Sequence, residues 1–451
     1  MSNLQNYQHY IEQFKTFEQN GASKSPSWVH DVRKNALVEF TNRGFPTTKQ
    51  EDWKYTNVGA IAKVSFQYDS HPVQISSGTV KNFLVDGADQ YVIVFVNGHF
   101  SKEHSRLNDL PENIVVKNVV EAYAAHGEIM RKHLFNYVKY QKNTFAALNA
   151  AFVNDGAFIH VPAKTEIGKP IHLLFISTAS GGEQCVSHIR NLIIVEEEAK
   201  ADFVHSFYSV GDHRNLTNVV TEIVAKKKSA VELVKVQKES ETAYHVENLL
   251  AHQEEASNVR IFSLALGGAI ARNDLSVIID GEGAECNLNG LYIVSGQQLI
   301  DHHTFMHHTS PDCPSHELFK GILNGNGRAV FNGKVFVNPE AQKTDSKQTN
   351  RNLLLSSTAV VDTKPELEIF ADDVKCTHGA AVGGLNPAHT FYLKSRGIGE
   401  EVSRTILTVG FAAEVTEKIK HQELRRHVDL LVVEDLKSKL GNTDLPEIVH
   451  V

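Results

Sequence analysis

The chain has 451 residues, enough for one large core with appended pieces or for two to three ordinary domains. Hydrophobic residues make up 41% and charged residues 22% of the sequence, which is typical of a soluble globular protein. The formal net charge is −8. This charge argues against a nucleic-acid-binding protein, because contact with phosphates requires a basic surface.

The N-terminus is polar and lacks the basic and apolar regions of a signal peptide. No apolar run approaches the length needed to span a bilayer. The four cysteines are far apart and show no paired spacing, which does not favour a disulfide framework; they are Cys185, Cys286, Cys313 and Cys376. We therefore expect a cytoplasmic protein that binds neither a membrane nor nucleic acid.

Residues 1–155 predict a helical and mixed N-terminal region. Two stretches carry apolar residues at helical spacing: Tyr7, Tyr10, Ile11, Phe14 and Phe17, and then Trp28, Val32, Leu37 and Phe40. A short strand is expected at Tyr91–Val96, ending in the turn Asn97-Gly98. Helical spacing returns over Val119–Val138 and Phe145–Phe152.

Residues 156–395 read as a long series of short strands separated by glycine-rich turns. No helical stretch lies between them, which excludes a parallel sheet with helical crossovers. An antiparallel sandwich and a β-solenoid both fit. Roughly 230 residues of strands is long for one sandwich, whereas a solenoid grows by adding coils. No fixed sequence repeat is visible, but the length favours a mainly β protein with a β-solenoid core.

Residues 396–451 predict a C-terminal helical region that begins near Gly399. Its apolar residues fall on two adjacent stripes: Val402, Ile406, Val409 and Ala413, and then Leu407, Phe411 and Val415. Because the helices are apolar on more than one side, part of this surface must pack on the solenoid. The remainder predicts a docking surface for a partner, for which we select Val402, Ile406, Val409 and Phe411.

Motifs of common enzyme classes are missing from the sequence. The segment Asn332–Val335 lacks the Ser or Thr that follows the lysine of a Walker A motif. There is no G-x-S-x-G, H-E-x-x-H or C-x-x-C sequence. We therefore expect a protein that is not an enzyme and has no nucleotide site of its own.

One candidate site is the histidine-rich segment Asp301–His308. On a strand, His303 and His307 point to one face, and His302 and His308 point to the other. Imidazoles on neighbouring coils could hold Zn, Fe or Cu, so a metal site at His303 and His307 is one interpretation. The other is that these histidines stack between coils and form local hydrogen bonds.

The second candidate site is the segment Asp372–Gly379, in which Cys376 and His378 are two residues apart and share a face if the chain is extended. The neighbouring Lys375 and an imidazolium could lower the pKa of the thiol, which would favour a nucleophile or a ligand for a soft metal. A buried cysteine beside a hydrogen-bonded histidine fits the spacing equally well.

A long, nearly continuous block of the sequence resembles a known family. Ser346–Ser356, Thr363–Ile369 and Asp372–Gly379 together are similar to the signature block of the SufB/SufD family, the scaffold proteins of SUF iron–sulfur cluster assembly. The segments Tyr392–Ile398 and Phe411–Val415 are also family-like.

Other features are similar to the SufD branch of that family. Phe45–Thr47 and Glu51–Thr56 resemble its N-terminal signature, and the sequence Cys-Thr-His-Gly at Cys376–Gly379 resembles its Cys-Ser-His-Gly. The acidic residue and second histidine that SufB typically carries in this block are absent.

The resemblance implies a right-handed parallel β-helix between helical N-terminal and C-terminal regions. It implies pairing with a SufB-like scaffold and binding of a SufC-like ABC ATPase through the C-terminal helices, with a possible homodimer when the chain is isolated. A nascent iron–sulfur cluster would form transiently at the SufB–SufD interface, with His378 as a ligand and Cys376 nearby, and no permanently bound cofactor is expected. The alternatives are a β-helix metalloprotein that uses His302–His308, and a structural solenoid in which Cys376 and His378 are inert.

Overall fold

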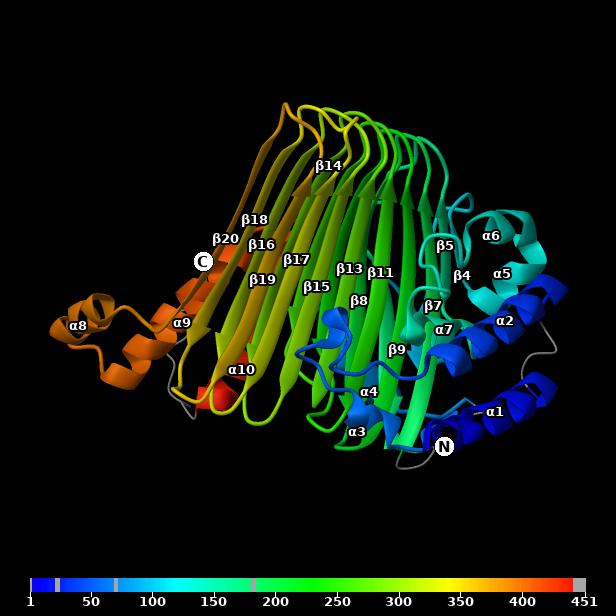
Figure 1. The fold of residues 1–451 in the computed structure, drawn as a ribbon, viewed down its shortest axis with the longest axis horizontal. Helices are drawn as coiled ribbons and strands as arrows, with labels where there is room; N and C mark the ends of the chain where they lie inside the picture. Colours follow the sequence, from blue (N-terminus) through cyan, green and yellow to red (C-terminus); the bar gives the residue numbers. More distant parts are fainter. Residues whose placement is uncertain (1, 21–24, 69–71, 180–183, 441–451) are drawn as a thin grey trace.

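The computed structural model describes residues 2–20, 25–68, 72–179 and 184–440. Its core is a β-solenoid in which successive strands alternate between two sheets, with helices at both ends (Figure 1). All pairings between successive coils are parallel, for example β16 with β18 and β18 with β20. The predicted mainly β fold with a solenoid core is confirmed, and an antiparallel sandwich is excluded.

Each sheet has ten strands. The first sheet contains, in spatial order, β19 (Val360–Ile369), β17 (Arg328–Val337), β15 (Leu299–His308), β13 (Ile270–Ile279), β11 (Tyr244–Gln253), β9 (Arg214–Ala225), β7 (Gln184–Val195), β5 (Ala157–Val161) and β4 (Val115–Asn118), with β1 (Gln67–Tyr68) paired to β7. The second contains β20 (Lys375–Gly383), β18 (Asp345–Leu354), β16 (Pro314–Leu323), β14 (Glu285–Val294), β12 (Asn258–Ala265), β10 (Ala230–Lys238), β8 (Lys200–Val210), β6 (Ile171–Thr178), β2 (Tyr91–Val96) and β3 (His99–Arg106).

The coils stack in register, although their lengths differ. Asn258 pairs with Glu285, an offset of 27 residues (285 − 258), whereas Pro314 pairs with Asp345, an offset of 31 (345 − 314). The differences are taken up in the turns between strands, so the ladder of hydrogen bonds continues without a fixed sequence period. This explains why no repeat is visible in the sequence.

Five of the N-terminal helices gather at one end of the solenoid (Figure 1): α1 (Ser2–Asn20), α2 (Ser27–Arg43), α5 (Val119–Ala125), α6 (Gly127–His133) and α7 (Thr144–Ala151). Three short ones lie further along it: η2 (Glu51–Trp53), α3 (Gly59–Ala62) and α4 (Ser77–Lys81). The strand expected at Tyr91–Val96 is β2, and the Asn97-Gly98 turn has φ of 47° and 79°, as a tight hairpin requires. This end therefore forms a cap over the first coils.

The prediction of one continuous helical stretch over Val119–Val138 is wrong. It breaks between α5 and α6, and after α6 the chain leaves the helical conformation, with φ of 68° at Phe135. The buried carboxylate of Glu222 accepts the backbone N–H groups of Phe135, Tyr137 and Val138 at 2.9 to 3.0 Å. These amides therefore cannot continue a helix, and a tertiary contact overrides the local pattern.

The C-terminal helices are α8 (Pro387–Ser395), α9 (Glu400–Thr416) and α10 (Gln422–Leu440). The helix expected near Gly399 is α9, whose N-cap is Gly399, but the helical region begins earlier than predicted, at Pro387 of α8. Periodicity did not reveal α8, which has no buried residue and projects from the end of the solenoid (Figure 1). The pair Asn386-Pro387 could have indicated the start of this helix, because the Asn386 side chain accepts a hydrogen bond from the amide of Ala388 and proline occupies the first turn. Among the described residues, no helix is both long and apolar enough to cross a membrane.

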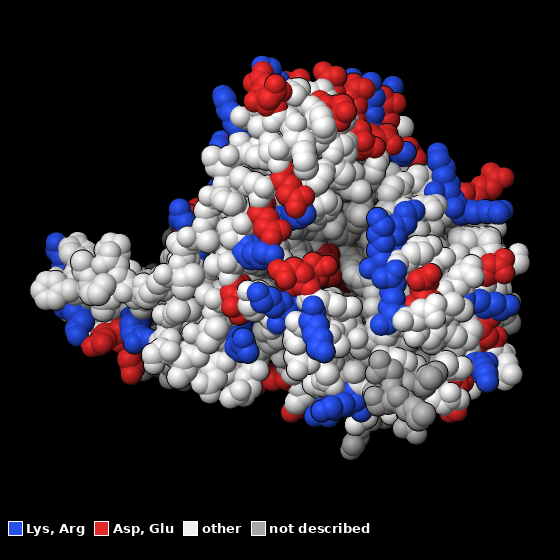
Figure 2. Space-filling model, in the orientation of Figure 1, with Lys and Arg blue, Asp and Glu red and all other residues white. Residues whose placement is uncertain are grey.

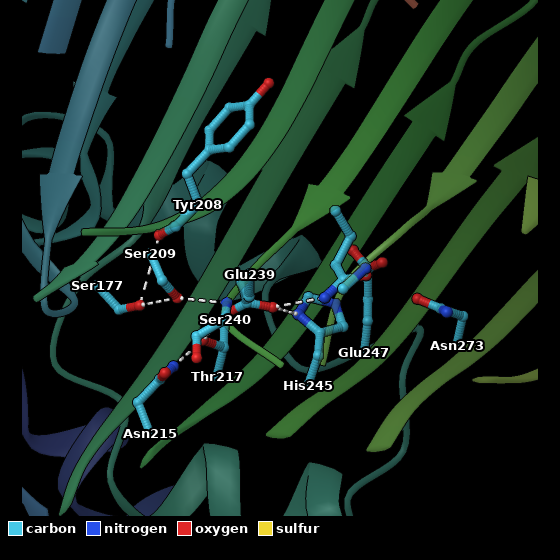
Figure 3. Close-up of polar contacts among 12 residues, drawn as sticks. Ser177, Tyr208, Ser209, Asn215, Thr217, Glu239, Ser240, His245, Glu247 and Asn273 are labelled. Atoms are coloured by element: carbon cyan, nitrogen blue, oxygen red, sulfur yellow. Dashed lines mark hydrogen bonds and ion pairs between the residues drawn. The ribbon is translucent and has the colours of Figure 1, made fainter. Parts of the chain in front are cut away.

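Ionisable side chains from both sheets meet inside the solenoid. Figure 3 shows Glu239, His245 and Glu247 pointing toward one another. Glu239 accepts a hydrogen bond from Thr217 Oγ1 at 2.5 Å and lies 2.8 Å from His245 Nδ1. Lys235 forms an ion pair with Glu247, and its Nζ lies 3.1 Å from His245 Nε2. The interior can hold these charges because each one faces a group of opposite sign or a hydrogen-bond partner.

Glu222 and Arg190 form a buried ion pair that fastens the N-terminal cap to the first sheet. The two side chains are 0% exposed and their Oε2 and Nη2 atoms are 3.0 Å apart. We expect Glu222→Gln to lower the free energy of unfolding by about 3–5 kcal/mol, because it leaves the guanidinium buried without its counter-charge. Urea denaturation of the isolated chain measures this loss.

The matched control for this change is Lys200→Gln, which removes one partner of the exposed pair Lys200–Glu166. This substitution should cost no more than about 1 kcal/mol. Equal losses for the two variants would contradict the role given to Glu222.

Glu317 on β16 is a second buried carboxyl, and burial raises its pKa from 4.5 to about 7. The folded chain therefore keeps a proton that the unfolded chain releases between pH 4.5 and 7, so stability falls as the pH rises through this window. We expect wild type to lose about 3 kcal/mol more than Glu317→Gln between pH 4 and pH 8, taking 1.36 kcal/mol per pH unit. Urea denaturation at both pH values tests this, and parallel pH profiles would rule it out.

Candidate functional site

The segment with Cys376 and His378 forms the last strand of the second sheet. β20 pairs with β18 on one side and lies at the edge of the sheet, as β19 does in the first sheet. Cys376 is partly buried against the apolar core, and His378 is exposed. Edge strands with free hydrogen-bonding groups are open to pairing with another chain. The site therefore lies at an open end of the solenoid.

The two candidate residues share a face, as their spacing predicted. In the register with β18, Cys376 lies beside Ser346 and His378 lies beside Gln348. Ser346 and Gln348 are buried, and neighbouring residues of parallel strands point to the same side. Cys376 and His378 thus extend two columns of side chains that face the interior.

Both columns change from apolar to polar as they approach the edge. The column that ends at Cys376 contains Val231, Val259, Cys286, Ser315 and Ser346. The column that ends at His378 contains Leu233, Ile261, Leu288, Glu317 and Gln348. In these two columns, the coils next to the edge strand therefore offer hydroxyl, amide and carboxyl groups, whereas the central coils have apolar or thiol side chains.

The pKa of the Cys376 thiol is raised, whereas the sequence suggested that it could be lowered. Burial raises its pKa, and the backbone N–H of Ser346 offsets this only in part. The idea that Lys375 lowers the pKa is wrong, because Lys375 is exposed and its strand position alternates with that of Cys376. Cys376 is therefore a neutral thiol in the isolated chain. Binding of a metal would have to displace its proton.

The histidines of β15 alternate as predicted, but each has its own partner. His303 lies 3.3 Å from Asp301, and His307 lies 3.0 Å from Asn338 Oδ1. On the inner face, His302 stacks on Tyr292, and His308 Nε2 lies 2.9 Å from Ser315 Oγ. Within the described ranges, no three His, Cys, Asp or Glu side chains are grouped to hold a metal ion. The metal site at His303 and His307 remains a prediction that this geometry does not favour.

Asp301 belongs instead to an anchor for the N-terminal segment. Arg272 forms ion pairs with Asp301 at 2.6 Å and Asp274 at 2.7 Å, and its guanidinium lies 4.4 Å from the ring centroid of Trp53. Thr56 donates a hydrogen bond to Asp301. The Glu51–Thr56 segment, noted in the sequence, is thus held on the outer face of the first sheet. On the face drawn in Figure 2, acidic and basic side chains are intermingled.

The four residues selected for partner binding are all partly buried. Val409 and Phe411 pack against the apolar cluster between α9, α10 and the second sheet. Phe411 also holds Lys320, whose Nζ lies 4.1 Å from its ring centroid and 2.8 Å from its carbonyl oxygen. Val402 and Ile406 are not part of that cluster. A hollow between β18, α8 and α9 is lined by other residues, among them Leu354, Phe391 and Arg404.

A thiol and an imidazole at an open edge are a donor set that suits iron and iron–sulfur clusters. Cys185, Cys286 and Cys313 are buried, whereas Cys376 is only partly buried. Two side chains leave coordination positions for ligands from elsewhere. The arrangement can therefore contribute to a shared site, with the other ligands supplied by a second chain.

Comparison with known proteins identifies the family of the chain. Residues 175–411 match the model of the SUF system FeS cluster assembly SufBD core domain, and residues 4–173 match that of the SufBD protein N-terminal region. The chain is 32% identical to an iron–sulfur cluster assembly SufBD family protein of Synechocystis sp., over 83% of this chain and 84% of that protein. It is 31% identical to the iron–sulfur cluster assembly protein SufD of Escherichia coli, over 95% and 97%. It is 25% identical to SufB of Bacillus subtilis, over 93% and 91%. The chain therefore belongs to the SufBD family of SUF-system iron–sulfur cluster assembly proteins.

Proposed function

We propose that this chain is the SufD-like scaffold subunit of a cytoplasmic SUF assembly complex and is not itself an enzyme. It pairs with a SufB-like subunit through the open coil formed by β19 and β20. A nascent iron–sulfur cluster, which is cargo and not a resident cofactor, forms between the two chains with His378 as a ligand and Cys376 close by. The observation that carries the proposal is the position of these two donors on β20, an edge strand that is paired on one side only.

The last coil supports pairing with a chain of the same kind. Solenoids need a cap at each end. The described residues provide helices at the first coils, but they pair β19 and β20 of the last coil on the inner side only. Several large apolar side chains on or beside this coil are exposed: Val360 at 43%, Ile369 at 36%, Phe370 at 61% and Val382 at 48%. The similarity to SufB over most of its length means that such a partner would bring a matching coil.

The C-terminal helices support docking of an ATPase subunit. Opening an interface to release a cluster requires energy, and the chain has no nucleotide-binding motif. On α8, Phe391 is 75% exposed and Tyr392 is 56% exposed. These two rings on α8, and the partly buried Val402 and Ile406 on α9, are apolar side chains that a partner would cover. Val409 and Phe411 contribute indirectly, because they hold α9 against the solenoid.

His378→Ala should reduce the cluster assembled by the heterocomplex to less than half of the wild-type yield, because it removes a ligand without disturbing the core. The measurement is anaerobic reconstitution of the complex with a SufB-like partner, followed by assay of iron and sulfide. His389→Ala, which changes an exposed histidine on α8, is the control and should leave the yield unchanged. A wild-type yield for His378→Ala would refute the assignment of this ligand.

The double substitution Val402→Asp/Ile406→Asp should weaken binding of a SufC-like ATPase by at least tenfold, because it places two charges on an apolar contact surface. Val38→Asp, at a 55% exposed position on α2 at the other end of the molecule, is the matched control. Titration calorimetry or pull-down with the purified ATPase measures the change. If the double variant binds as tightly as the control, the docking surface lies elsewhere.

A further inference from the structure

Gln348 lies in register between the carboxyl of Glu317 and the candidate ligand His378. The three residues occupy equivalent positions on β16, β18 and β20. Adjacent strands are about 4.8 Å apart, so each side chain is within reach of the next along the column. The amide of Gln348 can therefore contact one neighbour with its nitrogen and the other with its oxygen.

The contact with Glu317 determines which way the amide points. Gln348 Nε2 donates a hydrogen bond to Glu317 Oε2 at 2.8 Å. Above its raised pKa of about 7, Glu317 is an ionised carboxylate that can only accept hydrogen bonds, so it then fixes the amide nitrogen on its own side. The carbonyl oxygen, Gln348 Oε1, then has no partner, although it is buried. A buried carbonyl oxygen without a hydrogen bond is costly and calls for an explanation.

The facing strand leaves space for this amide. A Cβ atom at Gly333 on β17 would lie 2.4 Å from Gln348 Nε2 and 2.8 Å from its Cδ. Any larger residue at this position would displace the side chain. Gln348 therefore has Gly333 opposite it and Glu317 next to it on β16. Its neighbour on the other side, on the edge strand β20, is His378.

We propose that Gln348 is a positioning residue for His378. Gln348 Oε1 has no partner in the structure, so the exposed ring of His378 has to turn toward it. This oxygen then accepts the ring N–H that does not bind the cluster, and Glu317 holds the amide in the orientation that makes this possible. Histidines that bind metals almost always donate their other N–H to a carbonyl or carboxylate, which fixes the tautomer and the ring orientation. The inference rests on the proposed function, since it assigns the second hydrogen bond of the proposed ligand.

The arrangement also explains why a glutamine stands at this position rather than a carboxylate. A carboxylate at position 348 would face Glu317 directly, and two carboxylates in contact cannot both be ionised. An amide satisfies Glu317 with its donor and offers its acceptor to His378. A glutamine is thus able to meet both neighbours at once.

The first test reads the tautomer of His378 in the cluster-free chain by NMR with 15N-labelled histidine. Wild type should show one dominant tautomer. Gln348→Leu removes the acceptor, and Glu317→Gln keeps the size and polarity but no longer dictates the amide orientation, so both should give a mixture. Thr349→Val, whose position alternates to the other face of β18, is the control. A merely structural role of Glu317 would change stability and leave the tautomer unaltered.

The second test measures how fast the reconstituted heterocomplex loses its cluster to an iron chelator after assembly from ferrous iron and sulfide. Loss of such a hydrogen-bond partner typically weakens metal binding by about 10- to 100-fold, so both variants should release the cluster faster by up to this factor. If Gln348→Leu does not fold, Glu317→Gln decides.

An unchanged His378 tautomer in the folded variants overturns the inference. A changed tautomer with an unchanged rate of cluster loss overturns its link to cluster binding. Failure of the proposed function is a separate result, because it requires a wild-type cluster yield from His378→Ala.

Discussion

The structure depends on one constraint: every coil pairs in register with the coil before it. In such a ladder, a residue and its partners on the neighbouring coils point to the same side, so the interior is organised as columns of side chains. The core of most columns is apolar, as in Val231–Val259 and Leu233–Ile261. A polar residue can join a column only where its neighbours satisfy it. This is why buried charges occur as pairs, either between facing strands, as in Lys235–Glu247, or between neighbouring strands, as in Arg190–Glu222.

The same constraint gives the candidate site its character. A side chain on the last strand has a neighbour on one side only, so its chemistry is open to a second molecule. Cys376 and His378 therefore have Ser346 and Gln348 of β18 as neighbours on one side, and the other side is open to a partner. The neutral state of the Cys376 thiol, which burial favours, suits cargo that must leave, because a proton competes with the metal for the sulfur. Imidazole ligation would also make a cluster easier to release than four thiolates would.

The fold could be predicted from the sequence because short strands rich in β-branched residues are a local property, and they recur over a long stretch. The strand at Tyr91–Val96 was found in this way. The start of α9 at Gly399 was found from the helical spacing of the apolar residues that follow it. The break in the Val119–Val138 segment could not be found, because its cause is Glu222, which is distant in sequence. Helix α8 was missed for another reason: it buries no residue, so it has no apolar stripe to detect.

The candidate site shows a similar division. The shared face of Cys376 and His378 follows from the alternation of a strand, so spacing was sufficient. The protonation of Cys376 was misjudged, because the sequence does not show that the thiol is packed against the core, and this burial raises its pKa. The roles of Gln348 and Glu317 need the register between coils, in which residues about thirty positions apart become neighbours. Spacing within a strand identifies which side chains face a site, whereas only the register identifies what lies behind them. In a solenoid protein whose coils differ in length, the register cannot be read from a sequence repeat, so the residues behind the site must come from the structure.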